Sequence, residues 1–226
     1  MPLITDDDYL MRNRACTINP KAIERFLQHC TQRTFAKKSA IIRPGDPADS
    51  LLYIVKGNAV VTLEDEDGND VILAYVKAGE FIGEIGLFYN SHERRVLVRA
   101  RSACEVAEIS YEQLTTLFGT ELKDVHADLL TAFGLQLSQR LLKTSRCVTR
   151  LAFMDVAGRI ARTLLDMCSE PDAMSHPDGT QIQISRQEIA RIVGCSREVA
   201  GRVLKQMADE GMISVSGMKI VVHHSR

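Results

Sequence analysis

The chain has 226 residues, a formal net charge of −1, 45% hydrophobic residues and 25% charged residues. This length accommodates two domains with separate cores, and the composition is that of an ordinary globular protein. Because the net charge is close to zero, general binding of polyanions is excluded, and affinity for nucleic acid would need a local basic patch. No run approaches the roughly 18 apolar residues of a membrane span and no charged-then-apolar leader opens the chain, which predicts a cytoplasmic protein without a membrane partner.

The first half of the chain is predicted to be mostly β-structure. Residues 1–19 have weak periodicity and predict a loose arm, and a short helix is expected near Lys21–Cys30. From Ala36 to Ser110, short runs rich in Val, Ile and Leu are separated by Gly, Asp, Asn and Pro, which is typical of an antiparallel barrel or sandwich. Within Glu64–Asp70, the dipeptide Asp67-Gly68 is a strong signal for a hairpin turn, whose acidic tip is expected to be solvated.

One segment inside this β-region carries candidate binding chemistry. Gly83–Leu87 predicts a sharp turn into a short helix, and such a turn offers unpaired backbone N–H groups to an anion. Arg94 and Arg95 follow just before a strand, where an arginine can clamp a phosphate. Glu84 cannot bind phosphate but can accept from a sugar hydroxyl. The pattern indicates a nucleotide with a phosphate and a free ribose hydroxyl, although a salt bridge at a barrel corner would look the same.

A helical region begins at Tyr111–Phe118, and a long helix is predicted from about Val125 to Thr149. Its apolar residues recur at spacings of three and four, as in a seam between two helices. They are Leu129, Leu130, Phe133, Leu137, Leu141, Leu142 and Val148. One side of this helix would meet its mate in a second subunit, and a helix buried within one domain is the alternative. Leu151–Asp155 is expected to be a junction in which Asp155 caps the next helix, and Ser169–Gly179 a polar loop.

The stretch Ser185–Lys205 predicts two short helices broken at Gly194. Ser185 and Glu188 have the spacing of a capping box, Gly194 can adopt the positive φ that ends a helix, and Ser196 can cap the second helix. Two helices joined by a tight glycine turn form a helix-turn-helix, whose second helix places its N-terminal residues on base edges in the DNA major groove. A helical hairpin with a solvated basic face is the alternative.

The charges of this stretch favour DNA. Arg197 and Arg202 lie about 140° apart around a helix, so both can reach into one groove with Glu198 beside them. Arginine binds guanine bidentately and glutamate can accept from cytosine. Gly211–Val222 then predicts two short strands around Ser216-Gly217, which completes a winged DNA-binding domain. The side chains expected at the DNA are Arg186, Gln187, Ser196, Arg197, Glu198, Arg202 and Lys205.

The six cysteines and six histidines do not assemble a recognisable site. The cysteines are widely scattered with no CxxC pair, which predicts reduced side chains used as small apolar residues. No nucleophile–base pair or metal triad is visible, so we predict neither catalytic residues nor a metal site, and a protein that is not an enzyme.

Over nearly its full length the chain resembles the bacterial cAMP receptor protein family of transcription regulators. The blocks that carry the resemblance are GEFIGEIGLF with Arg94, AEISYEQL, Thr144-Ser145, RLAFMDVAGRIARTLLD, AMSHPDGTQIQISRQEIARIVGCSREVAGRVLK and SGMKIVV. The resemblance implies an α+β protein with a cyclic-nucleotide-binding β-roll at 1–124, a long dimerisation helix at 125–150 and a winged helix-turn-helix at 151–226. It implies a cytoplasmic homodimer that binds a two-fold symmetric operator on double-stranded DNA and contacts RNA polymerase.

The resemblance also implies a role for each pocket residue. Gly83 and its neighbouring amides would lie at the cyclic phosphate, Glu84 would hold the ribose hydroxyl and Arg94 would pair with the phosphate. Val61 and Leu73 would line the apolar wall. Thr144 and Ser145, on the long helix, would touch the base, one from each subunit. A ligand that bridges the β-roll and the dimer helix could shift the population of helix arrangements and so re-aim the recognition helices.

Three departures from the family pattern leave the ligand open. Arg95 stands where the family has a small hydroxyl residue, and the loop at Gly119–Asp128 looks longer than in the best-known cAMP-activated members. Both features resemble a subgroup associated with cyclic di-GMP or with DNA binding without a ligand. The expected effector is therefore cAMP, with cyclic di-GMP or no ligand as alternatives. The segment His29–Arg33 has fewer histidines than the family's polymerase-contacting patch, whereas Ser175–Gly179 retains the other polymerase-contacting pattern.

Two other classes compete with this interpretation. A redox regulator with an iron–sulfur cluster needs closely spaced cysteines near the N-terminus, which Cys16, Cys30 and the distant Cys104 do not supply. An enzyme that hydrolyses cyclic nucleotides usually needs clustered Asp and His metal ligands, and none is visible in the sequence.

Overall fold

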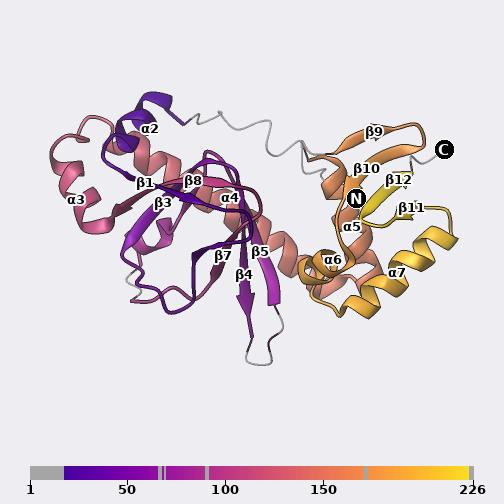
Figure 1. The fold of residues 1–226 in the computed structure, drawn as a ribbon. Coiled ribbons are helices and arrows are strands. Elements are labelled where there is room, and N and C mark those ends of the chain that lie inside the picture. Colours follow the sequence, from indigo (N-terminus) through magenta and orange to yellow (C-terminus); the bar gives the residue numbers. More distant parts are fainter. Residues whose placement is uncertain (1–17, 66–67, 69, 90–91, 171–172, 224–226) are drawn as a thin grey trace.

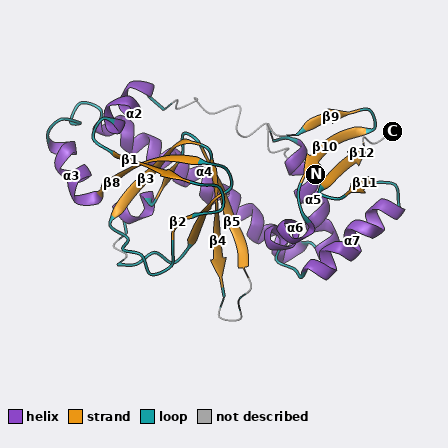
Figure 2. Ribbon diagram, in the orientation of Figure 1, coloured by secondary structure: helices purple, strands orange, loops and turns teal. Residues whose placement is uncertain are grey.

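The N-terminal half of the computed structural model folds as two β-sheets around a shared core (Figures 1 and 2). The structure describes residues 18–65, 68, 70–89, 92–170 and 173–223. In order across the first sheet, the strands are β1 (Thr31–Phe35), β8 (Cys104–Ser110), β3 (Ser50–Lys56) and β6 (Phe81–Ile82). In the second sheet they are β2 (Ala40–Ile42), β7 (Leu97–Ala100), β4 (Asn58–Glu64) and β5 (Asp70–Lys77). We call these two sheets the β-roll.

Alternation along the central strand divides the core of the β-roll into two layers. Neighbouring residues of a strand point to opposite faces. In β3, Leu51 joins a cluster under the helices, whereas Leu52 joins the cluster between the two sheets. The same division separates Ile109 from Val106 in β8. The sequence pattern of short, nearly continuous apolar runs therefore reflects strands that are covered on both faces.

Helices close one side of the β-roll. They are α2 (Pro20–Leu27), the 3₁₀ helix η1 (Glu84–Leu87), α3 (Tyr111–Gly119) and α4 (His126–Phe153). Phe81 of β6 makes edge-to-face contacts with Phe26 of α2 and Phe133 of α4, at ring-centroid distances of 5.6 and 4.8 Å. This aromatic cluster fixes the N-terminal part of α4 against the strand that precedes η1.

The C-terminal part has its own core and its own sheet. Its helices are α5 (Val156–Cys168), α6 (Arg186–Val193) and α7 (Arg197–Asp209). Its strands, in order across the sheet, are β11 (Ile213–Ser216), β12 (Lys219–His223), β10 (Gly179–Gln183) and β9 (Met174–His176). Ile160, Leu164, Ile189, Leu204 and Ile220 are among the buried residues that hold these elements together. The fold class predicted from the sequence is confirmed.

Several predicted boundaries differ from the structure. The first helix ends at Leu27, not near Cys30. The long helix continues to Phe153, past the expected junction at Leu151, because helical backbone persists until Met154 adopts extended dihedrals of −119° and 140°. Asp155 then caps α5 as predicted, its side chain accepting from the Gly158 N–H at 2.8 Å.

The expected polar loop at Ser169–Gly179 contains a strand. The last part of this segment forms a hairpin in which His176 pairs with Gly179. Residues 174–176 have no hydrophobic pattern of a strand, and they form one because their backbone pairs with β10. The predicted arm at residues 1–17 and the tip residues Glu66, Asp67 and Asn69 lie outside the described residues, but β4 and β5 form the predicted antiparallel hairpin. None of the helices built by the described residues is long and apolar enough to cross a bilayer.

Candidate nucleotide pocket and DNA-binding unit

The turn after β6 requires glycine at its first position. Gly83 has a φ of +92° and begins η1, as the sequence predicted. A Cβ at this position would lie 2.7 Å from Nη1 of Arg94 and 2.9 Å from the carbonyl oxygen of Ser50. The positive φ and the close approach of these two groups leave no room for a larger residue. The turn therefore places the backbone of η1 directly beside the guanidinium of Arg94.

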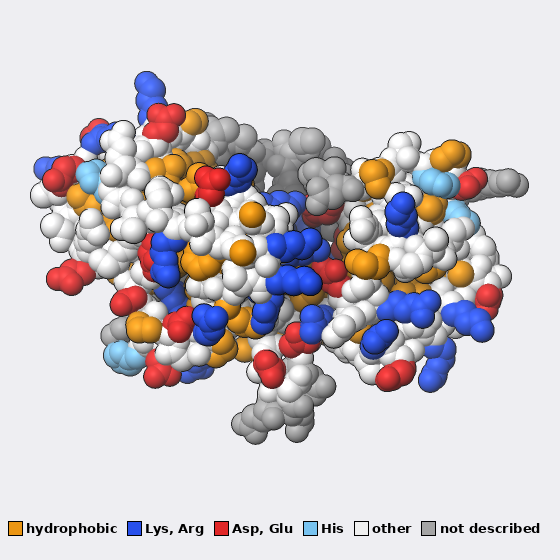
Figure 3. Space-filling model, in the orientation of Figure 1, with side chains coloured by type: hydrophobic (Ala, Val, Ile, Leu, Met, Phe, Trp, Pro, Cys, Tyr) orange, Lys and Arg blue, Asp and Glu red, His pale blue; other side chains and the backbone are white. Residues whose placement is uncertain are grey.

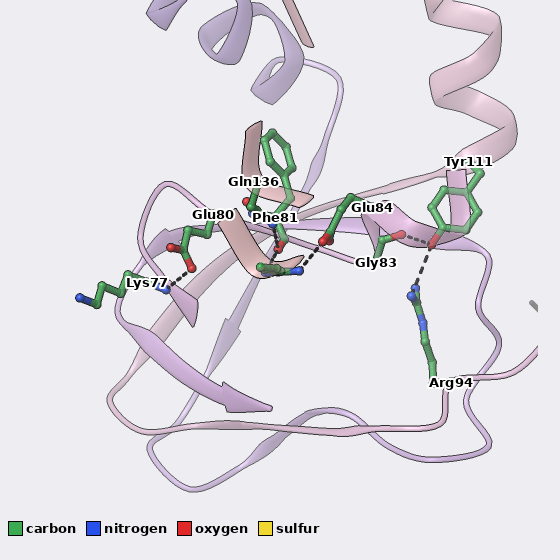
Figure 4. Close-up of polar contacts among 9 residues, drawn as sticks. Lys77, Glu80, Phe81, Gly83, Glu84, Arg94, Tyr111 and Gln136 are labelled. Carbon is green, nitrogen blue, oxygen red and sulfur yellow. Dashed lines mark hydrogen bonds and ion pairs between the residues drawn. The ribbon is translucent and has the colours of Figure 1, made fainter. Parts of the chain in front are cut away.

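Arg94 is held at this turn by two partners that the sequence did not indicate. One guanidinium nitrogen donates to the carbonyl oxygen of Ser50, and the other lies 3.4 Å from the hydroxyl of Tyr111. The Tyr111 hydroxyl in turn donates to the carbonyl oxygen of Gly83 at 2.6 Å (Figure 4). Burial raises the pKa of Tyr111, while the nearby Arg94 charge opposes that rise. Tyr111 therefore stays a protonated donor and orients both the turn and the arginine.

The carboxylate of Glu84 is completely buried and faces the long helix. Its Oε1 receives a hydrogen bond from Nη1 of Arg140, whose side chain is 28% exposed. Its Oε2 has no hydrogen-bond partner in the part of the chain that the structure describes. A buried carboxylate oxygen without a donor is costly. Glu84 thus has one oxygen committed to Arg140 and one buried acceptor without a donor among the described residues.

Two residues of α4 attach the helix to the strand that precedes Glu84. Gln136 makes a reciprocal pair with the backbone of Phe81, accepting from its N–H at 2.7 Å and donating to its carbonyl at 2.8 Å (Figure 4). Arg140, one turn further along, donates to the same carbonyl at 2.7 Å. Because Gln136 and Arg140 are four residues apart, both reach β6 from one face of α4.

The other residues expected in the pocket are more exposed than Glu84 and make none of the contacts described above. Val61 is half-buried, whereas the side chain of Leu73 is 52% exposed. Leu73 is the extra residue of a bulge, since Val61 pairs with Ala74 and the adjacent Thr62 pairs with Ile72. Thr144 and Ser145 lie exposed on α4, beyond Arg140. Arg95 is exposed as well.

The sequence therefore predicted Gly83, Glu84 and Arg94 as neighbours but missed four residues that organise them. These are Ser50, Tyr111, Gln136 and Arg140. The only available signal was the four-residue spacing of Gln136 and Arg140, which places two polar side chains on one face of α4. Nothing in the sequence linked that face to Glu84.

The helix-turn-helix forms as predicted, but the carboxylate of Glu188 does not complete the expected capping box, because it accepts from Tyr75 and Arg101 instead. Ser185 caps α6 by accepting from the Glu188 N–H at 3.1 Å, and Ser196 caps α7 by accepting from the Val199 N–H at 3.3 Å. Gly194 ends α6 with a φ of +67°. Arg159 of α5 donates to the carbonyl oxygen of Val193 at 3.0 Å, which places a cation at the C-terminus of α6, where the helix dipole favours it.

The side chains expected at the DNA lie on one open surface. All of them are exposed: Arg186, Gln187, Ser196, Arg197, Glu198, Arg202 and Lys205. An open hollow of about 410 Å³ is lined by Arg186, Arg197, Glu198 and Gly201. In Figure 3, lysine and arginine side chains gather over the region that α7 occupies in Figure 1. The arrangement fits a basic surface that meets a phosphate backbone while arginine and glutamate reach base edges.

The two parts of the chain match two family models in the same order. Residues 32–121 match the cyclic nucleotide-binding domain, and residues 158–225 match the Crp-like helix-turn-helix domain. The chain is also 49% identical over 210 residues to the CRP-like protein Clp of Xanthomonas campestris pv. campestris (strain B100), covering 93% of this chain and 91% of that protein. The chain belongs to the CRP family. Its members are DNA-binding transcription regulators, and this regulator carries the family's cyclic nucleotide-binding domain.

Solved structures agree with this assignment. The regulator superposes with a TM-score of 0.88 on the c-di-GMP-responsive global regulator CLP of Xanthomonas campestris, at 48% identity over 92% of this chain and 100% of that one. It also matches TTHA1359, a CRP/FNR-family regulator from Thermus thermophilus, with a TM-score of 0.69 and 26% identity, over 86% and 94% of the two chains.

Two of the described cysteines, Cys30 and Cys104, are poor candidates for thiolate ligands, whereas Cys147 is exposed. Burial raises the pKa of Cys30 to about 12, and burial also raises the pKa of Cys104. Cys30 donates to the carbonyl of Phe26 at 3.3 Å, and Cys104 to that of Asn58 at 3.2 Å. Cys16 lies outside the described residues. These contacts fit the predicted use of cysteine as a small buried residue.

We predict that Arg140→Ala lowers the free energy of unfolding by about 2–3 kcal/mol, because it leaves the buried Glu84 carboxylate without its cation. Lys143→Ala, which removes an exposed cation from the same helix, serves as the control. Urea titration followed by circular dichroism measures both. Adding Glu84→Ala to Arg140→Ala should recover part of the loss. A loss for Arg140→Ala no larger than that for Lys143→Ala would contradict the prediction.

Proposed function

We propose that this chain is a homodimeric transcription regulator whose affinity for a two-fold symmetric operator is set by a cyclic nucleotide bound between the β-roll and α4. The first candidate for the nucleotide is cAMP. As a DNA-binding regulator and not an enzyme, it would act in the cytoplasm, next to the chromosome. RNA polymerase would meet it at His29–Arg33 and at the β9–β10 turn within Ser175–Gly179.

The free acceptor on Glu84 is the observation that carries this proposal. A ribose hydroxyl that donates to Oε2 would satisfy a buried polar atom that has no partner among the described residues. A cyclic phosphate would then lie at the N–H groups after Gly83, beside the guanidinium of Arg94. Val61 and Leu73 would cover the apolar part of the ligand.

Arg140 supplies the route from the ligand to the long helix. It bonds the carboxylate that would receive the ribose and belongs to the helix that carries Thr144 and Ser145. A ligand that binds Glu84 on one side and these two side chains on the other has different affinities for different helix arrangements. Binding would therefore shift the population of arrangements, and with it the spacing of the two DNA-binding units.

Cyclic di-GMP is the second candidate, and two observations favour it. Arg95 places an exposed second cation beside Arg94, which suits a ligand with two phosphates. The Xanthomonas relative whose structure superposes well is described as responsive to c-di-GMP. DNA binding without a ligand is the remaining alternative, because the DNA surface is already exposed in this structure.

The proposal of a dimer rests on the apolar residues that α4 leaves uncovered. Leu141 and Val148, seven residues apart and therefore on one face of α4, are 68% and 59% exposed. An apolar stripe of this kind on a long helix is expected to meet another helix. In a parallel pair, two copies of α7 would present to successive turns of one major groove.

We predict that Arg94→Leu weakens nucleotide binding at least ~30-fold, because it removes the cation nearest the expected phosphate. Isothermal calorimetry of the full chain with cAMP and with cyclic di-GMP measures this, with Arg99→Leu on the same β-roll as the control. Arg95→Ser distinguishes the two ligands. It should weaken the binding of cyclic di-GMP, and it should leave the binding of cAMP unchanged or strengthen it. Unchanged titrations of Arg94→Leu with whichever nucleotide binds the wild type would show that the pocket is elsewhere.

We predict that Arg197→Ala and Arg202→Ala each cost about 1–3 kcal/mol of operator affinity and relax specificity at one base pair. The operator is first selected from random duplexes with the wild-type protein, and affinities are then measured by fluorescence anisotropy at fixed salt. Arg162→Ala on α5 is the control. If both variants selected and bound the same duplexes as wild type, α7 would not be the recognition helix.

We predict that Leu141→Glu together with Val148→Glu converts a dimer into a monomer, because the stripe would then carry charge where apolar side chains meet. Sedimentation velocity of the wild type and the double variant measures the mass. Lys143→Glu, on the same stretch of α4, should leave the dimer intact. A wild-type protein that sediments as a monomer would overturn the proposal of a dimer directly.

A further inference from the structure

A separate group of polar contacts joins the β-roll to the helix-turn-helix within one subunit. Glu188 of α6 accepts through Oε1 from the hydroxyl of Tyr75 at 2.7 Å and from Nη2 of Arg101 at 2.8 Å. The guanidinium of Arg101 lies over the ring of Tyr75, 4.5 Å from its centroid. One carboxylate thus receives a phenol and an arginine that also contact each other.

A second ion pair lies one turn further along α6. Nε of Arg191 lies 2.6 Å from Oδ1 of Asp70, the first residue of β5. Glu188 and Arg191 are three residues apart and therefore lie on one face of α6. That face packs against β5, the edge strand of its sheet, and α6 lies next to β5 in Figure 1. We call Asp70, Tyr75, Arg101, Glu188 and Arg191 the clasp.

The carboxylates of the clasp are mostly buried, whereas its two arginines, Arg101 and Arg191, are 41% and 38% exposed. The carboxylate side chains of Glu188 and Asp70 are 20% and 26% exposed, whereas Lys56 and Glu105, paired at 3.6 Å on the β-roll surface, are 76% and 51% exposed. Burial and the hydrogen bond to Glu188 raise the pKa of Tyr75, so its hydroxyl remains a donor. The two contacts on Glu188 are partly buried and share one acceptor, so they are worth more than isolated surface pairs, whereas Arg191 meets Asp70 as an ion pair in which Nε makes no hydrogen bond within the described residues.

The clasp leaves the DNA-binding surface open. Arg186 and Gln187 are exposed on the same helix, and so are Arg197 and Arg202 on α7. Besides the clasp, the chain itself at Met154–Asp155 and an ion pair between Lys77 of β5 and Glu170, 2.5 Å apart, connect the helix-turn-helix to the β-roll. Contacts that hold the helix-turn-helix in one orientation before it binds DNA lower the entropic cost of binding.

We propose that the clasp is an orientation device: it fixes α6 on β5 of the same subunit and so holds the helix-turn-helix in the direction in which it binds the duplex. Leu73, the bulge residue expected in the pocket wall, lies between Asp70 and Tyr75 on β5. A ligand at Leu73 would therefore act on a strand that contacts the DNA-binding unit. This last step rests on the proposed function, whereas the clasp itself does not.

A charge-swap series on the full-length protein tests the clasp. Arg191→Asp breaks the pair with Asp70, and Asp70→Arg combined with Arg191→Asp restores it with reversed polarity. Tyr75→Phe removes a single hydroxyl and guards against a variant that does not fold. Lys56→Glu is the matched charge reversal at an ion pair within the β-roll, and Tyr89→Phe is the matched loss of an exposed hydroxyl.

Hydrogen exchange followed by mass spectrometry reports the clasp, and affinity for the selected operator reports its consequence. Arg191→Asp and Tyr75→Phe should raise exchange in the peptides that cover β5 and α6 about tenfold, and lower operator affinity about three- to tenfold. The restored pair should return both toward wild type, although residue 191 is then an aspartate. Both controls should match wild type.

Several results would overturn the proposal. Unchanged exchange in Arg191→Asp and Tyr75→Phe would show that the contacts do not hold α6 on β5. Higher operator affinity in these variants would show that the clasp restrains the DNA-binding unit. Affinity that falls without a change in exchange, or that the restored pair does not recover, would assign these residues a direct role at the DNA. If wild type bound no duplex at all, the proposed function would fail, while exchange would still decide whether the clasp forms.

Discussion

The contact between Glu84 and Arg140 is the constraint on which the rest of the molecule depends. A fully buried carboxylate needs a cation, and the cation that pairs with this one comes from the helix that leads to the DNA-binding part. One ion pair therefore does two things: it neutralises the buried charge in the β-roll and it fixes the position of α4. Gln136 reinforces the same attachment through the backbone of Phe81, and the aromatic cluster around Phe133 seals it with apolar contacts. The second oxygen of Glu84 is the one acceptor of this group of contacts that has no donor among the described residues.

The clasp is a second attachment between the β-roll and the C-terminal part. Arg140 ties the β-roll to α4, and Glu188 ties it to α6. The helix-turn-helix is thus connected to the β-roll along two paths, one through the long helix and one directly through β5. A change in the orientation of the helix-turn-helix therefore has to alter at least one of these two attachments.

Local chemistry allowed much of the fold to be predicted from the sequence. The caps Ser185 and Ser196 and the turn glycines Gly83 and Gly194 depend on neighbours within a few residues, so the printed sequence contains the signal. Long-range partners could not be predicted. Arg140 is 56 residues from Glu84, and Tyr75 is 113 residues from Glu188; no spacing rule joins them. The strand at Met174–His176 was missed for a related reason, because its backbone ladder, and not its side chains, makes it a strand.

The bare backbone at Gly201 gives the side chain of Arg186 a place to rest. A Cβ at residue 201 would lie 3.7 Å from Cδ of Arg186, which is an ordinary van der Waals contact, so a methyl group there would touch the aliphatic stem without displacing it. A longer side chain at residue 201 would compete with Arg186 for the same surface of α7. The contact between α6 and α7 at this point therefore favours a small residue, although that residue carries no polar group.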